Sequence, residues 1–287
     1  MEYSTNNDII LLALGKLLVN QQRTINSTNI NDYEFKIFSQ FGDDGIIQYL
    51  IHTLNINHNC FIEFGVEDYS ESNTRFLLMN NNWSGFVIDG SIDNINRLTN
   101  SDYFWRYDLQ ATAEFITAEN INTIINKSGM SDIGILSIDI DGNDFFVLKA
   151  IDLSKINPDI LILEYNSVFG SKRKITIPYD PKFQRTEKHY SNLYWGASLP
   201  ALDQLAKEKG YGLIGSNLAG NNAYFLRKDL LNNVFSQKSA DSVWKDSNFR
   251  ESRNKDNTLS YLRKEQRLEL IKGLPVLNIE TGLIEPL

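Results

Sequence analysis

The 287-residue sequence has a single cysteine and fewer positive than negative side chains, and each shortage excludes a class of protein. Cys60 has no partner for an internal disulfide, and no Cys/His spacing motif predicts a structural zinc site. This cysteine usage is typical of a reducing compartment. A total of 28 Lys and Arg against 36 Asp and Glu gives a net charge of −8 and a pI near 5. We therefore expect no nucleic-acid partner, because a phosphate backbone is bound by basic surfaces.

Long hydrophobic runs are also missing. The longest candidate, residues 9–19, is too short to span a bilayer, carries Lys16 in its middle, and has neither a basic start nor a small-residue cleavage pattern. We interpret it as a helix that packs on the body of the protein, or on a second subunit in a homo-oligomer. The sequence thus predicts a protein of the cytoplasm without a membrane span.

Glycine is scarce where nucleotide-binding loops need it. The turn after residues 60–64 contains only Gly65 instead of the G-x-G-x-x-G fingerprint, and no Walker A motif occurs. This absence weakens any interpretation that requires a pyrophosphate at this turn.

From residue 60 onward, short apolar runs alternate with helical patterns, which is typical of βαβ units and a parallel sheet. The last two predicted strands are joined by five residues only, so they must form an antiparallel hairpin. The predicted strands are 60–64, 85–89, 103–107, 133–139, 160–164, 211–216 and 222–226, and the predicted helices are 73–80, 92–98, 119–126, 144–151 and 197–209.

These patterns divide the chain into three parts. An N-terminal helical segment covers residues 1–58, an α/β core covers 59–228, and a C-terminal extension covers 229–287. Within the core, residues 167–195 show no clean period, and a loop of this length is typical of a lid or a binding segment. The extension is an oligomerisation arm or a cover.

In an open α/β sheet, ligands bind beyond the carboxyl ends of the strands, so the side chains at those ends are the candidates. Glu63 and Gly65 end the first strand, where glycine allows close approach of a ligand. Asp89 ends the second strand, and its carboxylate can accept hydrogen bonds from both hydroxyls of a ribose. The alternative is that Asp89 caps the helix that begins at Ser91.

The fourth and fifth strand ends carry the densest group of oxygen ligands. Asp139 and Asp141 alternate with isoleucine and project to one side of the sheet edge, and Glu164 and Asn166 follow the neighbouring strand. Like charges this close need a cation or a shared proton, and oxygen ligands suit Mg²⁺. The alternative for residues 141–144 is a plain turn with Asp144 as a helix cap.

His189 lies within the insert at 167–195. A histidine near carboxylates can act as a general base, and the alternative is a solvated loop residue. Tyrosine and tryptophan residues around it suit a sugar ring or a base, although they could equally form the insert's own small core. The basic residues of the insert offer a positive patch to an anionic acceptor such as a nucleotide diphosphate; they are Lys172, Arg173, Lys174, Arg185 and Lys188.

Three segments, 61–65, 85–91 and 136–142, resemble motifs of S-adenosylmethionine-dependent methyltransferases of the FkbM-like kind. The segments 39–45 and 195–199 resemble further elements of a subgroup found beside capsule and surface-polysaccharide genes. The resemblance covers about residues 39–227 and implies a Rossmann-like, seven-stranded, mostly parallel sheet with a reversed final strand. The single glycine of the first loop departs from the pattern of many members.

The resemblance implies a set of site residues. Glu63 and Gly65 would hold the methionine end of S-adenosylmethionine, Asp89 with Ser91 its ribose, and Asp139 would lie near the amino group or the acceptor. Related sugar and catechol O-methyltransferases place Mg²⁺ at the ends of the fourth and fifth strands, which would make Asp139, Asp141, Glu164 and Asn166 ligands for Mg²⁺ or Mn²⁺ here.

The function expected from these residues is O-methylation of a sugar or nucleotide-activated sugar in capsule or surface-polysaccharide biosynthesis. Either a base, His189, Asp141 or Asp139, or a metal ion would activate the acceptor hydroxyl. Two alternatives are a nicotinamide-dependent oxidoreductase and a non-catalytic nucleoside-binding protein.

Overall fold

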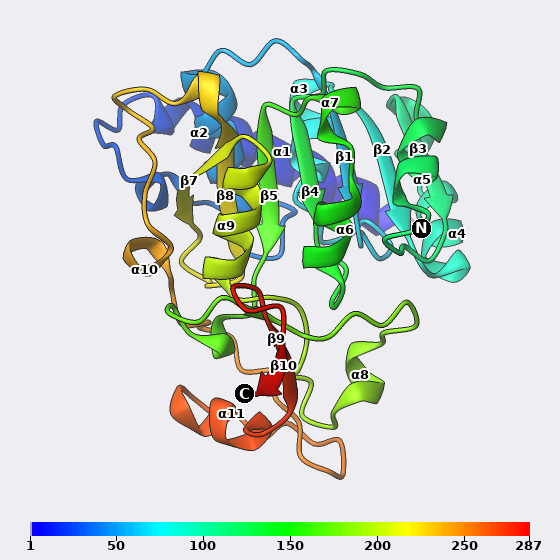
Figure 1. Ribbon diagram of the computed structural model, residues 1–287. Coiled ribbons are helices and arrows are strands. Elements are labelled where there is room, and N and C mark those ends of the chain that lie inside the picture. Colours follow the sequence, from blue (N-terminus) through cyan, green and yellow to red (C-terminus); the bar gives the residue numbers. More distant parts are fainter. Residues whose placement is uncertain (1) are drawn as a thin grey trace.

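A computed structural model describes residues 2–287, with side chains from residue 7 onward (Figure 1). Its main element is a seven-stranded sheet in the order β3-β2-β1-β4-β5-β8-β7, in which β8 alone runs in the direction opposite to the other six strands. This confirms the expected Rossmann-like sheet and its terminal hairpin. The strands are β1 (Cys60–Phe64), β2 (Ser84–Asp89), β3 (Leu109–Ala113), β4 (Ile135–Ile138), β5 (Ile160–Glu164), β7 (Tyr211–Ser216) and β8 (Asn222–Arg227).

Alternating side chains of the strands supply the two hydrophobic cores of the sheet. Ile62 and Ile88 point into one core with the apolar faces of α5, α6 and α9, whereas Phe61 and Val87 point into the other with α2 and α3. The helices are α1 (Glu2–Gln22), α2 (Asp43–Thr53), α3 (Arg75–Asn81), α4 (Ile92–Thr99), α5 (Ile121–Lys127), α6 (Asp144–Ala150), α7 (Leu153–Ile156) and α9 (Leu199–Glu208). Helix α1 packs on α2 and α3.

One strand prediction was wrong. The aromatic run at 103–107 has strand-like composition, but it forms the 3-10 turn η2 (Phe104–Arg106), in which Trp105 is 77% exposed. The third strand is instead β3, whose sequence contains a single large apolar residue, Leu109. Because β3 lies at the edge of the sheet and pairs only with β2, it needs little apolar character.

The insert and the C-terminal extension fold together into a small lobe. Strand β6 (Ile175–Thr176) of the insert pairs with β9 (Pro275–Asn278), which pairs with β10 (Ile284–Pro286). Phe169, Trp195, Ile271 and Val276 share one hydrophobic core there. The lobe also contains η3 (Ser167–Phe169), α8 (Arg185–Lys188) and α11 (Glu265–Ile271) and lies beyond the end of the sheet toward which β5 points (Figure 1). Before it, η4 (Lys228–Leu230) and α10 (Ala240–Val243) follow the sheet, and η1 (Ile30–Tyr33) precedes α2.

A membrane-spanning helix was not expected, and none of the helices within residues 2–287 is both long enough and apolar enough to be one.

Candidate functional site

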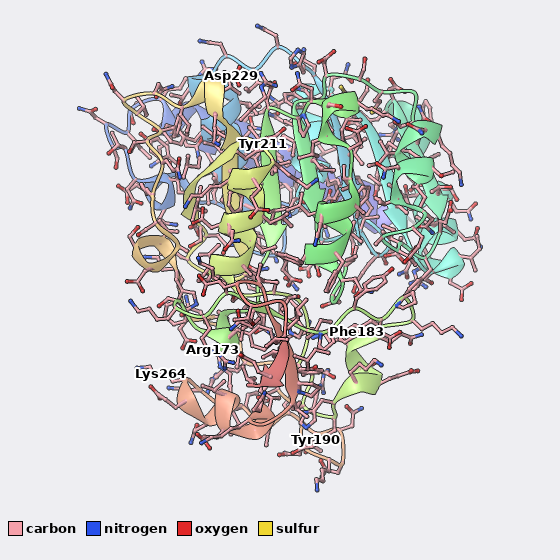
Figure 2. All side chains as sticks on the ribbon, viewed as in Figure 1. Arg173, Phe183, Tyr190, Tyr211, Asp229 and Lys264 are labelled. Atoms are coloured by element: carbon pink, nitrogen blue, oxygen red, sulfur yellow. The ribbon has the colours of Figure 1, made fainter. Side chains whose placement is uncertain are left out.

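A cavity of about 430 Å³ opens where the carboxyl ends of β1, β2, β4 and β5 face the lobe. The strand order changes direction between β1 and β4, which is where open α/β sheets bind ligands. The lobe adds Phe183 and Arg185 to the wall, and the segment leading to α11 adds Phe249 and Glu251. In Figure 2, Phe183 lies at the side of the lobe that faces the sheet.

Glu63 is buried in this wall, and both of its carboxylate oxygens are occupied. It accepts hydrogen bonds from the hydroxyls of Ser72 and Thr74 and from the backbone N–H groups of Asn73 and Thr74. Burial raises its pKa above the ordinary value. The structure therefore gives Glu63 the task of fixing residues 72–74, of which Ser72 and Asn73 line the cavity.

Gly65 allows the loops after β1 and β4 to approach each other. Its φ is +74°, and a Cβ atom at this position would lie 1.5 Å from the carbonyl oxygen of Asp139. No side chain can be accommodated at that distance, so the glycine is required by the backbone geometry.

Asp89 lines the cavity and is held by three hydrogen bonds. Its Oδ2 accepts from the backbone of Glu67 at 2.9 Å, and its Oδ1 accepts from the backbone of Ser91 at 2.8 Å and from the Asn94 amide at 2.9 Å. A carboxylate has about four acceptor positions, so one remains for a ligand. Ser91 is the N-cap of α4 and is not among the residues that line the cavity, and its contact with the cofactor stays a prediction.

The residues after β3 form the apolar part of the same end of the cavity. Phe115 and Ile116 line it, and the Phe115 ring is 46% exposed although it is a large apolar group. Its nearest atom lies 3.3 Å from where a Cβ of Gly90 would be. Sequence reasoning missed this pair because the strand before it was placed too early in the chain.

Three carboxylates gather at the other end, as expected. Oxygens of Asp139, Asp141 and Glu164 lie within 4.8 Å of one another. Burial raises the pKa values of Asp139 and Glu164 well above the ordinary range, and the neighbouring carboxylates raise them further. Glu164 Oε2 is buried without a hydrogen-bond partner, which leaves it available for a ligand.

Asn166 is not among the residues that line the cavity, and its role as a metal ligand stays a prediction. Its amide nitrogen donates to the carbonyl oxygens of Leu193 and Trp195, and its Oδ1 accepts from the N–H of Val168. Both donors of its amide group thus tie the start of the insert to its end. Asp144 likewise holds the turn after β4 by accepting from the N–H groups of Ile140 and Gly142.

His189 lies outside the set of residues that line the cavity. Its Nδ1 is 2.7 Å from the hydroxyl of Ser191, and its ring stacks obliquely on Tyr190, which Figure 2 shows at the far tip of the lobe. Partial burial, together with Lys255, lowers its pKa. The structure thus brings the carboxylates together but not the histidine.

The basic residues of the insert do not form a free positive patch. Each is paired with a carboxylate, mostly in exposed ion pairs of the weak kind, and an anionic acceptor bound by them stays a prediction. The pairs are Lys172 with Asp241, Arg173 with Glu285, Lys174 with Glu280, Arg185 with Asp141 and Glu251, and Lys188 with Asp180.

A buried network of polar side chains lies next to the carboxylate end of the cavity. Asp43, at the start of α2, accepts hydrogen bonds from Tyr224, Asn222 and Asn217. Asn222 is paired with Glu164 in the sheet and lines the cavity. The network thereby connects the N-terminal segment to β8, which no spacing in the sequence indicated.

Three comparisons with known proteins gave results of different strength. Curated protein sequences gave no match. Among solved structures, the N-terminal domain of EvdMO1 with SAH bound has a TM-score of 0.41 and 10% identity, covering 66% of this chain and 81% of that chain. The O-methyltransferase from Bacillus cereus in complex with SAH has a TM-score of 0.41 and 13% identity, covering 75% and 89%. Likenesses this distant carry no weight for function.

The family match is stronger. The sequence model of the methyltransferase FkbM domain matches residues 24–213, a span that contains β1 to β5 and the cavity residues of their carboxyl ends. Because the match covers more than half of the chain, the protein belongs to the FkbM methyltransferase family.

Proposed function

We propose that the protein transfers a methyl group from S-adenosylmethionine to a hydroxyl of a sugar or nucleotide-activated sugar in capsule or surface-polysaccharide biosynthesis. The observation that carries this proposal is a cavity with two chemically different ends. Asp89 and Phe115 form one end, and Asp139, Asp141 and Glu164 form the other. Family membership supports the methyltransferase chemistry.

The residues of the cavity fit S-adenosylmethionine. Asp89 keeps one acceptor position for a ribose hydroxyl, and the exposed ring of Phe115 offers a stacking surface for adenine. Gly65 lines the cavity at the end of β1, where we place the methionine end. Glu63 lines the cavity and fixes residues 72–74 beside the methionine end. The cofactor is cationic, and an acidic cavity suits a cation.

The bound cofactor supplies an electrophilic methyl group on a sulfonium. The protein's own residues then have to position the acceptor hydroxyl and take its proton. Oxygens of Asp139 and Glu164 lie within 4.8 Å of each other, and Glu164 is buried. Asp139 is therefore the proposed proton acceptor, and Glu164 is the group that orients the hydroxyl. Asp141 is held toward the site by Arg185 at 2.6 Å.

The same three carboxylates are the proposed ligands of Mg²⁺ or Mn²⁺. Their oxygen atoms are close enough to share one ion, and the unpartnered Oε2 of Glu164 is an oxygen of the kind hard cations prefer. A bound divalent cation would lower the pKa of an acceptor hydroxyl.

Methyl transfer is tested with cofactor carrying a labelled methyl group and a panel of sugars, glycosides and nucleotide sugars. Loss of activity in EDTA with recovery in Mg²⁺ or Mn²⁺ supports the metal, whereas full activity in EDTA leaves Asp139 as a metal-free base. Asp139→Asn should lower kcat by about 10²-fold or more in either case. The absence of label from every acceptor, with S-adenosylhomocysteine bound, would favour the non-catalytic nucleoside-binding alternative.

A further inference from the structure

Three buried oxygen atoms in the cavity wall have no hydrogen-bond partner: Asn143 Oδ1, Glu164 Oε2 and Asn222 Oδ1. Their residues are only 3%, 6% and 3% exposed. Neither amide can be turned around, because Asn143 Nδ2 donates to the carbonyl oxygen of Asp180 and Asn222 Nδ2 donates to the carboxylate of Asp43. A buried acceptor without a donor is costly, so these atoms indicate a ligand that donates hydrogen bonds.

The missing partners are of one kind only. Among the described residues that line the cavity, no buried side-chain nitrogen or hydroxyl lacks a partner. Glu164 and Asn222 belong to β5 and β8, on the far side of β4 from Asp89. Asn143 follows β4 as the N-cap of α6. The three oxygen atoms therefore lie near Asp139 and Glu164, where we propose that the substrate to be methylated binds (the acceptor end), and not at the proposed adenosine end.

Charge at this end is mostly negative. Among the described residues that line the cavity, four carboxylates, those of Asp139, Asp141, Glu164 and Glu251, face one cationic side chain, Arg185. The Arg185 guanidinium is already engaged by Asp141, Glu251 and the carbonyl oxygen of Asn192. Even with one shared proton or one bound divalent cation, the four carboxylates and Arg185 together would keep a net negative charge. An acid group entering here would meet repulsion from these carboxylates.

We infer that the ring which enters this end of the cavity is an uncharged polyol, a neutral sugar, and not a uronic acid, a sialic acid or a ring-phosphorylated sugar. The hydroxyls of such a ring donate to Asn143, Glu164 and Asn222, whereas a carboxylate or phosphate can only accept. This inference rests on the proposed function and specifies its substrate class. It concerns the reacting ring alone, so a nucleotide carried outside the cavity is compatible with it.

The test uses the full-length protein loaded with S-adenosylhomocysteine and matched pairs of probes: methyl glycosides of neutral hexoses and the corresponding methyl uronides. Binding of each probe is measured by saturation-transfer NMR, which detects dissociation constants in the millimolar range. We expect a saturation-transfer signal from the neutral glycosides and at least about tenfold weaker binding of the uronides. Equal or stronger binding of the uronides, or binding of neither series, would overturn the inference.

A variant pair identifies the atoms responsible. Glu164→Gln removes one charge and supplies a donor at nearly constant shape, so the discrimination against uronides should fall several-fold. Glu208→Gln removes the same charge from the exposed end of α9 and should leave the discrimination unchanged. Unchanged discrimination in Glu164→Gln would contradict the inference. Failure of S-adenosylhomocysteine to bind in the first step would instead refute the proposed function.

Discussion

Gly65 is the residue on which the shape of the cavity depends most directly. Gly65→Ala would force the carbonyl of Asp139 away from the loop after β1, so we expect loss of S-adenosylhomocysteine binding and a decrease of at least about 2 kcal/mol in the free energy of unfolding. Denaturant unfolding and calorimetry measure the two effects.

Gly129→Ala is the matched control, because Gly129 also has a positive φ, +65°, but nothing lies within 4 Å of its Cβ position. This variant should be destabilised by about 1 kcal/mol and keep its affinity. Equal effects in the two variants would mean that backbone strain alone, and not the contact with Asp139, explains the glycine.

For His189, the sequence and the structure lead to different expectations: a general base in the first case and a residue outside the cavity in the second. A general base at this position would make His189→Gln lose about 10²-fold or more in kcat, whereas its location outside the cavity predicts a change within about threefold. Steady-state kinetics on any acceptor that the panel identifies decides between the two values.

The lowered pKa of His189 also has a measurable effect on stability. Its folded-state pKa lies below the ordinary 6.5, so the unfolded chain binds more protons near that pH. The contribution of His189 to stability is therefore complete above about pH 6.5 and is lost as the pH falls. NMR titration of the ring checks the direction, and a value above 6.5 would contradict it.

At the scale of elements, the hydrogen bond from Tyr224 to Asp43 joins β8 to α2. Tyr224→Phe would remove a donor from a fully buried carboxylate and should cost about 2–3 kcal/mol. Tyr211→Phe removes a hydrogen bond to the neutral carbonyl of Pro158 and should cost only about 1 kcal/mol. Denaturant unfolding compares them, and the reverse order would show that the network is not important for stability.

The lobe provides a second prediction for elements. Ile271 is fully buried in the core that the insert shares with the C-terminal extension. Ile271→Ala should cost about 2–4 kcal/mol within the lobe and raise hydrogen exchange in both β6 and β9. Faster exchange in β9 alone would mean that the insert and the extension do not fold as one unit.

The sequence predicted elements well where pattern and burial coincide. The apolar strands β1, β2, β4 and β5 and the amphipathic helix α4 lie within a few residues of their predicted positions. Edge strand β3 was misplaced because it buries only Leu109, and the strand β6 was missed because its partner β9 lies about a hundred residues later. Such pairing depends on tertiary contacts that no local pattern contains.

The candidate site shows the same division. The parallel topology made the strand ends predictable as the place of the site. Gly65, Asp89, Asp139, Asp141 and Glu164, which were named on that ground, do line the cavity. The hydrogen bonds of Asn166, the ion pairs of the insert and the unpartnered oxygen of Asn222 depend on which segments meet after folding. Residue type alone cannot distinguish a carboxamide that binds a ligand from one that ties a loop.

At the scale of the whole molecule, the cavity lies between the seven-stranded sheet and the small lobe, which are built from different parts of the chain. The sheet supplies the carboxylates and Gly65, and the lobe with its approach segment supplies Phe183, Arg185, Phe249 and Glu251. Phe249 stacks on Phe41 at 5.1 Å between ring centres, which joins the C-terminal extension to the loop before α2. The extension therefore completes the wall around the acceptor end.

The central claim is that this cavity binds S-adenosylmethionine through Asp89. Isothermal titration calorimetry tests it most directly. The wild-type protein is titrated with S-adenosylhomocysteine and with NAD⁺, and the Asp89→Asn variant is titrated with S-adenosylhomocysteine. The control is Asp93→Asn, which changes an exposed residue on α4. We expect binding of S-adenosylhomocysteine to the wild type and to Asp93→Asn, at least about tenfold weaker binding to Asp89→Asn, and none of NAD⁺. Binding of NAD⁺ in place of S-adenosylhomocysteine, or unchanged affinity in Asp89→Asn, would contradict the account.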